Sequence, residues 1–570
     1  MNKIKILAIM GDNNLSASKY HRLYLPLTAL EGKVIKVGEE DKEINVDFID
    51  TFNPPLEILE KYNIIWNNFS CNIPNTIIGL LQSKGIIFIE DVDDYWELPK
   101  KSIMVPIVGR SYDNVPILSS LSDVTICATG TLGVSVIPYS NNISISNNDL
   151  PIGEGQFTVR DNIKEGEKIV IGVIGSVSHL PDYQSIANVI KRITLNKEIK
   201  EKCKFVIAGY VEKDKNWDKI VAIFSQNGFE VELRNSLPLE NYMEAYKGIN
   251  IVLAPLSDVE FNRKKSALKA LECSLWNIPM ISNLMYADKE FNGVIVAKTD
   301  KSWIETIRYL IQDDNYVEIG KRLGEVNRNL SNFEGRIENL RLLVEASMNK
   351  KLVSDLETLD MYSIKYREDQ NTEYQSYLNQ NKETSWRFEY NPLMNIVPKV
   401  EKEYVGVLSW RFLQKTGLAK NLLYNMIKPT LKEGNVDMIN LSPRKWLSGK
   451  EYMEFSEKQH PGLENLLKLI CLKLGVIYNP NPKNIVYSNF FILKTSIYKE
   501  YVEEWIKPAL ACLEGEYWTL ANKDANYIGG LSKEDLKLHT GLDYYNMITF
   551  VLERLILQFI ECKKLKVKNV

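Results

Sequence analysis

The sequence lacks the features that would assign it to several large classes of protein. Its seven cysteines are scattered among 570 residues without a Cys-x-x-Cys pair, which argues against a structural zinc site and is typical of a reduced, cytoplasmic protein. No run of about 18 apolar residues occurs, so we expect no membrane span. The formal net charge of −3 gives no overall electrostatic reason to bind nucleic acid or an anionic membrane, although it allows a local basic face.

The first residues, MNKIKILAIMGDN, also lack the pattern of a signal peptide. Their apolar run is only about five residues long and leads directly into a glycine loop, so we expect a first β-strand here. Hydrophobic residues make up 45% of the chain and charged residues 25%, which is the profile of an ordinary globular protein. The length is too great for one core and predicts about two to four domains.

Short apolar segments alternate with helical patterns through roughly the first 345 residues, which predicts an α/β fold with parallel strands. We expect strands at 3–10, 46–49, 64–66, 86–89, 124–128 and 134–137, then a polar linker at 141–167. A second alternation predicts strands at 168–176, 204–208, 230–233, 251–253 and 293–296, with helices that include 239–247, 302–312 and 314–348. Two Rossmann-like domains, 1–145 and 146–348, should therefore face a cleft that holds the substrate.

The remainder of the chain has a different composition. Residues 349–389 are polar and rich in Asp, Glu, Gln and Tyr, which predicts a helical connector. Residues 390–570 contain a few apolar segments and several amphipathic helices, one of them at 543–560, and predict an α+β domain.

The stretch 253–288 has the pattern of a strand, a polar loop, a helix and a second strand, and so of a right-handed βαβ unit. Arg263, Lys264, Lys265 and Ser266 stand where the helix begins. Their charges, the helix dipole and backbone N–H groups would together hold a phosphate or diphosphate there. Glu272, about two turns further, could accept hydrogen bonds from two neighbouring sugar hydroxyls, so the stretch predicts a nucleotide-sugar site. Further donor contacts are expected from Glu260, Asn262 and Lys269.

Two glycine-containing loops follow expected strands and would reach the same cleft. In the loop 175–182, Gly175 and Ser176 come directly after the strand and His179 precedes a helix. His179 either hydrogen-bonds within its own loop or faces the crevice with Lys265. In the loop after the first strand, Gly11 is followed by Tyr20, His21 and Arg22 at the mouth, where they are either surface residues at a helix start or acceptor contacts.

An acidic segment leaves the carboxyl end of the strand expected at 86–89. Asp91, Asp93 and Asp94 stand where an α/β sheet places its ligands. One alternative is a solvated turn with helix-capping aspartates. A divalent-metal site is the other, but no second cluster of suitable ligands accompanies the segment, so we expect no metal.

These residues resemble glycosyltransferases of the GT-B fold, most closely the retaining family-4 type. The likeness lies in SKYHR…P (18–26), DVDDYWELP (91–99) and FNRKKSALKALE (261–272), and it covers roughly residues 1–345. The last two segments together are similar to those of phage and bacterial enzymes. In the third region, SWRF (409–412), HPG (460–462) and SNFF (488–491) resemble nucleotide-diphospho-sugar transferases of the GT-A type.

The resemblance implies transfer of a sugar from a nucleoside-diphosphate sugar, most simply a UDP-sugar, to an acceptor hydroxyl, with retention and without an obligatory metal or cofactor. Lys265 and Ser266 would hold the diphosphate and Glu272 the ribose. The residues expected to act in the chemistry are Lys265, Asp91 and His179; those on the acceptor side are Gly11, Tyr20, Arg22, Asp93 and Asp94. The sequence departs from the family at Lys264, where many members carry a glutamate near the transferred sugar. Glu260 or Asp258 would have to substitute for that glutamate.

Three functions remain open at the level of sequence. The acceptor is a surface polysaccharide, a lipid-linked sugar or a protein; or the chain is a phage enzyme that glycosylates hydroxymethylated bases in DNA; or it is a non-catalytic scaffold built on a decayed transferase, as Lys264 suggests. The C-terminal region either catalyses a second transfer or, as we favour, recognises the acceptor or mediates assembly into an oligomer.

Overall fold

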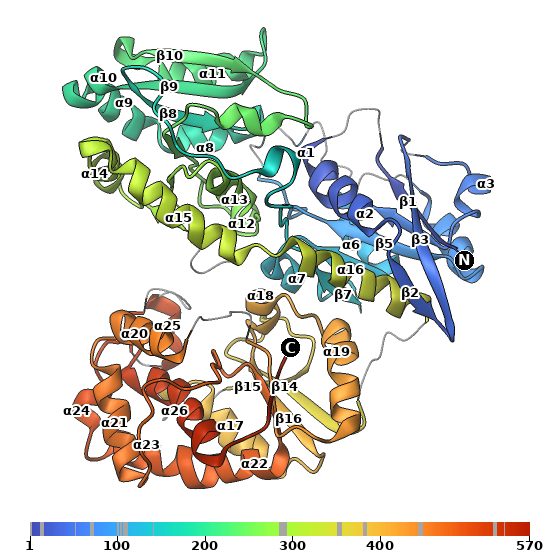
Figure 1. Ribbon diagram of the computed structural model, residues 1–570, viewed down its shortest axis with the longest axis vertical. Helices are drawn as coiled ribbons and strands as arrows, with labels where there is room; N and C mark the ends of the chain where they lie inside the picture. The colour runs from blue at the N-terminus through green and yellow to red at the C-terminus, as the bar shows by residue number, and fades with distance from the viewer. Residues whose placement is uncertain are drawn as a thin grey trace. The chain divides into compact units, whose positions relative to one another are not determined.

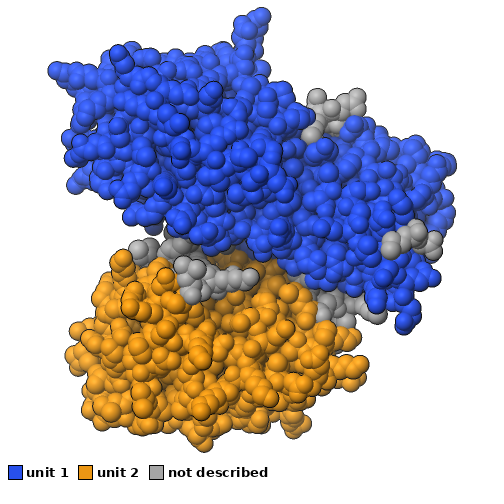
Figure 2. Space-filling view, in the orientation of Figure 1, with its two compact units in different colours: residues 1–351 blue, residues 352–570 orange. Residues whose placement is uncertain are grey.

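The computed structural model describes residues 3–11, 16–51, 53–68, 73–99, 102, 105, 112–140, 142–283, 293–349, 356–379, 385–442, 448–527, 533–540 and 542–570. The chain divides into two compact units, residues 1–351 and 352–570 (Figure 2). Among the described residues, no helix combines the length and the apolar composition that crossing a membrane requires.

The first half of unit 1 is built on a seven-stranded sheet in the order β2-β3-β1-β4-β5-β6-β7 (Figure 1). Its pairs are parallel except for the β2–β3 hairpin. The inner strands are short apolar runs, as expected of strands covered on both faces. The strands are β1 (Lys3–Ile9), β2 (Val34–Val37), β3 (Glu40–Ile49), β4 (Ile64–Asn67), β5 (Ile87–Val92), β6 (Val124–Cys127) and β7 (Ile143–Ile145). The helices are α1 (Ala17–Lys19), a π-helical turn (Tyr20–Tyr24), α2 (Leu25–Leu30), α3 (Leu56–Leu59), α4 (Asn75–Ser83), α6 (Val115–Leu121) and α7 (Gly130–Val136).

The strand expected at 134–137 is wrong, because these residues fall at the end of helix α7. The Thr129 side chain accepts a hydrogen bond from the backbone N–H of Leu132 and so caps the first turn. The valines that suggested a strand are compatible with a helix that packs against β6 and β7. Tertiary packing has overridden their intrinsic preference.

The second half of unit 1 contains a six-stranded, all-parallel sheet in the order β10-β9-β8-β11-β12-β13. In sequence terms this is the 3-2-1-4-5-6 order of a Rossmann fold. The strands are β8 (Ile169–Ile174), β9 (Cys203–Tyr210), β10 (Val231–Asn235), β11 (Ile251–Leu253), β12 (Met280–Ser282) and β13 (Val294–Val296). The helices are α8 (Leu180–Ser185), α9 (Ala187–Leu195), α10 (Lys197–Lys202), α11 (Lys215–Phe224), α12 (Glu260–Arg263), α13 (Leu268–Leu275), α14 (Asp300–Ile311), α15 (Tyr316–Leu330) and α16 (Phe333–Met348).

Two helix predictions in this half need correction. The helix expected at 239–247 is a short 3-10 turn, Tyr242–Tyr246. The single helix expected at 314–348 is divided into α15 and α16, because Ser331 is extended and the Asn332 side chain accepts from the N–H of Gly335 to start a new helix. Helix α16 then packs on α2 and β2 of the first half.

Unit 2 is a mixed α/β body with a sheet in the order β15-β14-β16-β18-β17-β19. Strand β18 is antiparallel to both of its neighbours, whereas β14 is parallel to β15 and β16. The strands are β14 (Leu359–Lys365), β15 (Gln375–Leu378), β16 (Tyr404–Ser409), β17 (Met438–Asn440), β18 (Phe491–Lys494) and β19 (Val567–Asn569). The helices are α17 (Tyr390–Ile396), α18 (Phe412–Thr416), α19 (Lys420–Glu433), α20 (Gly449–Gln459), α21 (Leu463–Lys473), α22 (Thr495–Glu500), a π-helical turn (Tyr501–Ile506), α23 (Lys507–Glu514), α24 (Trp518–Ala521), α25 (Lys533–Thr540) and α26 (Met547–Lys563).

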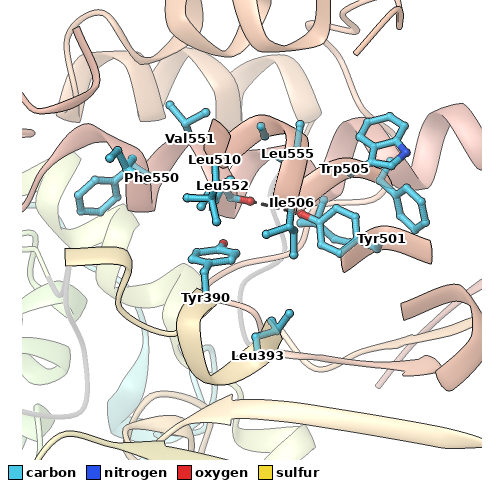
Figure 3. Close-up of a cluster of buried hydrophobic side chains, with 14 of the residues drawn as sticks. Tyr390, Leu393, Tyr501, Trp505, Ile506, Leu510, Phe550, Val551, Leu552 and Leu555 are labelled. Carbon is cyan, nitrogen blue, oxygen red and sulfur yellow. Dashed lines mark hydrogen bonds between the residues drawn. The ribbon is translucent and has the colours of Figure 1, made fainter. Parts of the chain in front are cut away.

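Helix α26 forms the centre of unit 2. Its side chains Phe550, Val551 and Leu555 are buried, and Figure 3 shows them in one cluster with Tyr501 and Trp505. The expected core helix at 543–560 is thereby confirmed, with its start moved to Met547.

The helical connector expected at 349–389 is wrong for the described residues, because they contain strands β14 and β15. Leu359, Met361 and Ile364 are buried in β14. The polar composition indicates a helical connector, but β14 pairs with β16 along six residues, from Leu359–Tyr404 to Ile364–Ser409. Long-range pairing of this kind leaves little trace in local composition.

Candidate functional site

A cavity of about 620 Å³ lies within unit 1, between its two sheets. Ser18, Asp93 and Asp94 line it from the first half. From the second half it is lined by the loops that follow β8, β9, β10 and β11, and by the start of α13. All of these loops leave the carboxyl ends of parallel strands, where α/β sheets bind ligands. The expected cleft between two Rossmann-like halves is confirmed.

Two glycines bring the ends of β8 and β9 close together. Gly209 has a φ of +97°, and a Cβ at this position would collide with the carbonyl oxygen of Gly175. A Cβ on Gly175 would in turn lie 3.2 Å from Cδ2 of His179. The Lys269 ammonium donates to the carbonyl oxygen of Ile174 at 2.6 Å and closes the same corner. Only glycine fits here, and the backbone of Gly175 and Ser176 is left open to the cavity.

Asp182 organises the loops on this side of the cavity, and the sequence analysis missed it. Its Oδ1 accepts hydrogen bonds from the Ser257 N–H and hydroxyl and from the Asn262 amide, each at 2.8 Å. Its Oδ2 lies 2.9 Å from Nδ1 of His179. Asn262, expected as a donor contact, therefore positions a loop and does not line the cavity. The buried carboxylate of Asp182 joins the loop after β8 to the loop after β11.

His179 lines the cavity as a neutral imidazole. Burial, together with the charge of Lys265, lowers the pKa of His179 to about 4. Because the Asp182 carboxylate only accepts, the proton of neutral His179 lies on Nδ1. Its Nε2 is thus left as an acceptor for a hydroxyl or N–H of a ligand.

Lys265 and Ser266 precede helix α13 and line the cavity, as the βαβ pattern predicted. None of the described carboxylates forms an ion pair with Lys265, whose Nζ lies 5.2 Å from the centre of the Phe261 ring. The Ser266 hydroxyl accepts from the Asn148 amide at 3.1 Å. A cation and a helix amino end therefore face the same space, and both favour an anion.

Glu272 lines the cavity from α13 and is held by two tyrosines that the sequence analysis also missed. The Tyr242 hydroxyl donates to Oε1 at 2.9 Å and the Tyr246 hydroxyl to Oε2 at 2.6 Å. Burial, together with the Glu272 charge, raises the pKa of both tyrosines, so they remain donors. Their spacing of four residues was visible in the sequence, but nothing there indicated that both would face Glu272. Each carboxylate oxygen keeps a further lone pair for a ligand hydroxyl.

Asp93 and Asp94 form the opposite wall. The Ser18 hydroxyl donates to Oδ2 of Asp93, while Oδ1 of Asp93 is buried and has no hydrogen-bond partner among the described residues. Burial, reinforced by the neighbouring charge of Asp94, raises the pKa of Asp93 to about 7. Asp94 accepts from the Tyr112 hydroxyl at 3.2 Å. This wall can accept hydrogen bonds from the hydroxyls of a second substrate.

Of the other residues expected at this side, His21 lines the cavity, whereas Gly11, Tyr20 and Arg22 do not. Asp91, which was expected to act in the chemistry, also lies outside the lining. Asp91 and Arg22 form a buried ion pair, with 2.7 Å between Oδ1 and Nε. A buried guanidinium requires such a partner, which explains why Asp91 faces away from the cavity. The Tyr20 hydroxyl accepts from Gln156 at 3.0 Å, and Gly11 is buried beyond β1.

The three consecutive cations 263–265 have three different environments. Arg263 is exposed and pairs with Asp258. Lys264 is buried: its Nζ lies 3.0 Å from Glu260, donates to the Ser135 hydroxyl at 2.6 Å and sits 3.7 Å from the centre of the Tyr95 ring. Lys264 and Glu260 thus connect the two halves of unit 1 and do not line the cavity. In the described part of the chain, Lys265 is the member of this group that faces the ligand space.

Among the described residues, no group of three or more His, Cys, Asp or Glu side chains is placed to hold a metal ion.

Unit 1 has two Rossmann-like sheets in one compact body and a polar cavity between the carboxyl ends of their strands. This is the GT-B arrangement.

No protein-family model and no curated protein matches the sequence. Solved structures do match. A putative UDP-N-acetylglucosamine 2-epimerase from Listeria monocytogenes is 12% identical, with 62% of this chain and 98% of that chain covered and a TM-score of 0.40. A UDP-forming α,α-trehalose-phosphate synthase from Burkholderia xenovorans is 10% identical, with coverages of 61% and 99% and a TM-score of 0.41. HepE from Anabaena, in complex with UDP and glucose, is 10% identical, with coverages of 60% and 100% and a TM-score of 0.42. These matches are distant, and the function of the cavity has to be argued from its own residues.

Proposed function

We propose that residues 1–351 transfer a sugar from a nucleoside-diphosphate sugar to an acceptor hydroxyl. The observation that carries the proposal is that Lys265, Ser266 and Glu272 face one cavity, opposite the carboxylates of Asp93 and Asp94. The cavity's volume of about 620 Å³ is in the usual range for organic ligands of this size. One wall suits an anion and a ribose, and the other suits the hydroxyls of an acceptor.

The diphosphate would lie between Lys265, Ser266 and the backbone of Gly175 and Ser176. In the reaction, the bond between sugar and diphosphate breaks and the leaving group gains negative charge. A fixed ammonium and a helix amino end stabilise this charge most in the transition state, which lowers the barrier. This arrangement operates without a metal ion, and a UDP-sugar is the donor we favour.

The ribose would lie against Glu272, whose carboxylate is fixed by Tyr242 and Tyr246. His179, through Nε2, and Asp93 would accept hydrogen bonds from the transferred sugar or from the acceptor. We propose a retaining outcome and a glycan acceptor, in line with the resemblance of segments 91–99 and 261–272. Neither Asp91 nor Lys264 lines the cavity. Lys264 then connects the two halves through Ser135 and Tyr95, and Asp91 balances the buried charge of Arg22 within the first half.

The first experiment measures binding of UDP, UMP, GDP and ADP by isothermal titration calorimetry, and turnover of UDP-sugars by release of UDP. Lys265→Ala should weaken UDP binding about 10- to 100-fold, because a charge-assisted contact to phosphate is worth about 1.5–3 kcal/mol. UMP binding should change less, since UMP lacks the second phosphate. Turnover should fall at least as much as UDP affinity.

Lys301→Ala is the matched control. Lys301 is exposed on α14 and, among the described residues, pairs with Glu305 at 3.7 Å. The variant should bind and turn over like the wild type. Absence of nucleotide binding in the wild type, or equal behaviour of the two variants, would contradict the proposal. Nucleotide binding without any turnover would leave a binding module in place of an enzyme.

A further inference from the structure

Unit 2 contains a cavity of its own, and three sequence segments that resembled transferases meet there. The lining includes Ser409, Trp410 and Arg411 from the first segment, His460 from the second and Ser488 from the third. The topology explains the convergence. β14 and β16 are parallel and end at this edge of the sheet, whereas β18 is antiparallel and begins at it.

One side of this cavity is a continuous wall of aromatic rings. The His460 ring stacks on Phe550 with 3.9 Å between centres, Phe550 lies 5.3 Å from Tyr527, and Tyr527 lies 5.2 Å from Tyr545. Tyr545 in turn stacks on Phe388 at 5.0 Å. These contacts hold the rings in place. Binding an apolar ligand face against them therefore costs little side-chain conformational entropy.

Polar groups surround this wall. The Thr549 hydroxyl is buried and has no hydrogen-bond partner among the described residues, although Thr549 lines the cavity. Nδ1 of His460 lies 2.6 Å from the Ala525 carbonyl oxygen, so Nδ1 carries a proton and Nε2 is an acceptor. The carboxylates of Glu389 and Glu553 also reach the lining. A buried hydroxyl without a partner is costly, and a ligand that bonds to it would recover that cost.

The volume of the cavity and the charges that line it limit the ligands that it can bind. The cavity measures about 90 Å³, far below the roughly 300–1,000 Å³ of sites that enclose drug-sized molecules. Arg411, Lys415 and Arg554 line it together with Glu389 and Glu553, so charges of both signs lie close together, and Arg554 is paired with Glu553 at 2.6 Å. A single uncharged ring with one apolar face and several hydroxyls fits these constraints, and a nucleoside diphosphate does not.

We infer that residues 352–570 carry a second ligand site, and that it binds one uncharged sugar ring against this aromatic wall. The inference does not depend on the function proposed for unit 1. It gives unit 2 the role of recognising a saccharide. The source of the sugar, a free monosaccharide or the end of a glycan, is distinguished by comparing reducing sugars with methyl glycosides.

The test is saturation-transfer difference NMR on the full chain. The probes are glucose, galactose, mannose and N-acetylglucosamine, their methyl glycosides, and UDP. We expect signals from at least one neutral sugar. Trp410→Ala, which removes a half-buried indole from the cavity lining, should abolish them, and Thr549→Val should weaken the affinity roughly three- to tenfold by removing one hydrogen bond.

Two controls show whether a loss of sugar signal comes from the cavity itself. Thr549→Val replaces a hydroxyl without a partner by a methyl group of the same shape, so its unfolding temperature should not fall. Trp518→Ala, on α24 and outside the cavity lining, should leave the sugar signals unchanged. The inference is overturned if no sugar gives a signal, if the signals survive both cavity variants, or if Trp410→Ala removes UDP signals alone. UDP binding to unit 1, measured through Lys265→Ala, succeeds or fails independently.

Discussion

At the scale of single residues, the burial of Asp93 in unit 1 changes its ionisation in a way that a stability measurement can detect. Burial and the adjacent Asp94 charge raise its pKa to about 7, against an ordinary value of 3.8. Because the folded state holds the proton more tightly than the unfolded state, Asp93 contributes stability below about pH 4. This contribution is lost as the pH rises from about 4 to about 7.

Asp93→Asn should therefore gain stability relative to the wild type as the pH rises through this window. Asparagine keeps the acceptor for the Ser18 hydroxyl but never places a charge beside Asp94. The measurement is the free energy of unfolding of both proteins, from urea titrations at pH 4.5, 6 and 8. A difference between them that does not vary with pH would show that Asp93 titrates normally.

The sequence does not show which of two neighbouring charged residues faces the cavity. Lys264 and Lys265 are adjacent, but Lys265 lines the cavity while Lys264 is buried and paired with Glu260. Asp91 and Asp93 are two residues apart, but Asp93 lines the cavity while Asp91 is buried and paired with Arg22. The partners of Lys264 include Ser135 and Tyr95, more than a hundred residues away in the sequence. No spacing rule within the segment could have separated the two lysines.

At the scale of elements, the site depends on how closely the ends of β8 and β9 approach. Gly209→Ala should destabilise the protein by about 2–4 kcal/mol, as the sum of backbone strain at positive φ and overpacking against the Gly175 carbonyl. It should also weaken nucleotide binding, because the backbone of Gly175 lines the cavity. Urea denaturation and calorimetry with UDP measure the two effects.

Gly166→Ala measures the cost of backbone strain at positive φ without a steric collision of the new Cβ. Gly166 has a φ of +99°, close to the +97° of Gly209, but a Cβ there would meet nothing within 4 Å. We expect a cost of about 1 kcal/mol from strain alone and unchanged UDP binding. Equal effects of the two substitutions would mean that the contact between β8 and β9 is not what requires glycine.

At the scale of the whole molecule, Arg336 connects the end of unit 1 to its beginning. It lies on α16 and is buried, with Nε donating to the Ser146 hydroxyl at 2.9 Å, Nη1 to the Asp149 carbonyl oxygen at 3.2 Å and Nη2 to the His21 carbonyl oxygen at 2.9 Å. Arg336→Met should lower the stability of unit 1 by about 3 kcal/mol, because it leaves buried acceptors unpaired. Hydrogen exchange should show faster exchange in β1, α2 and α16.

The control lies on the same helix. Arg341 is partly exposed, pairs with Glu338 and Glu345, each at 2.9 Å, and, among the described residues, donates a single hydrogen bond to the backbone of the first half, to the Val34 carbonyl oxygen at 3.3 Å. Arg341→Met should cost no more than about 1 kcal/mol. If both substitutions cost the same, the buried hydrogen bonds of Arg336 are not what holds α16 to the first half.

The sequence by itself determined the two β-α alternations of unit 1 and the strand ends that carry its loops, and it predicted that Lys265, Ser266 and Glu272 face one cavity, whereas it left open whether His179 does. This was possible because buried parallel strands are short apolar runs and their carboxyl ends converge at one edge of a sheet. Only the tertiary structure decided that Asp182 and the pair Tyr242 and Tyr246 support this site, that Lys264 and Asp91 face away from it, and that residues 359–365 and 375–378 form strands. Each of these outcomes depends on partners distant in sequence, whose hydrogen bonds and packing outweigh local preference.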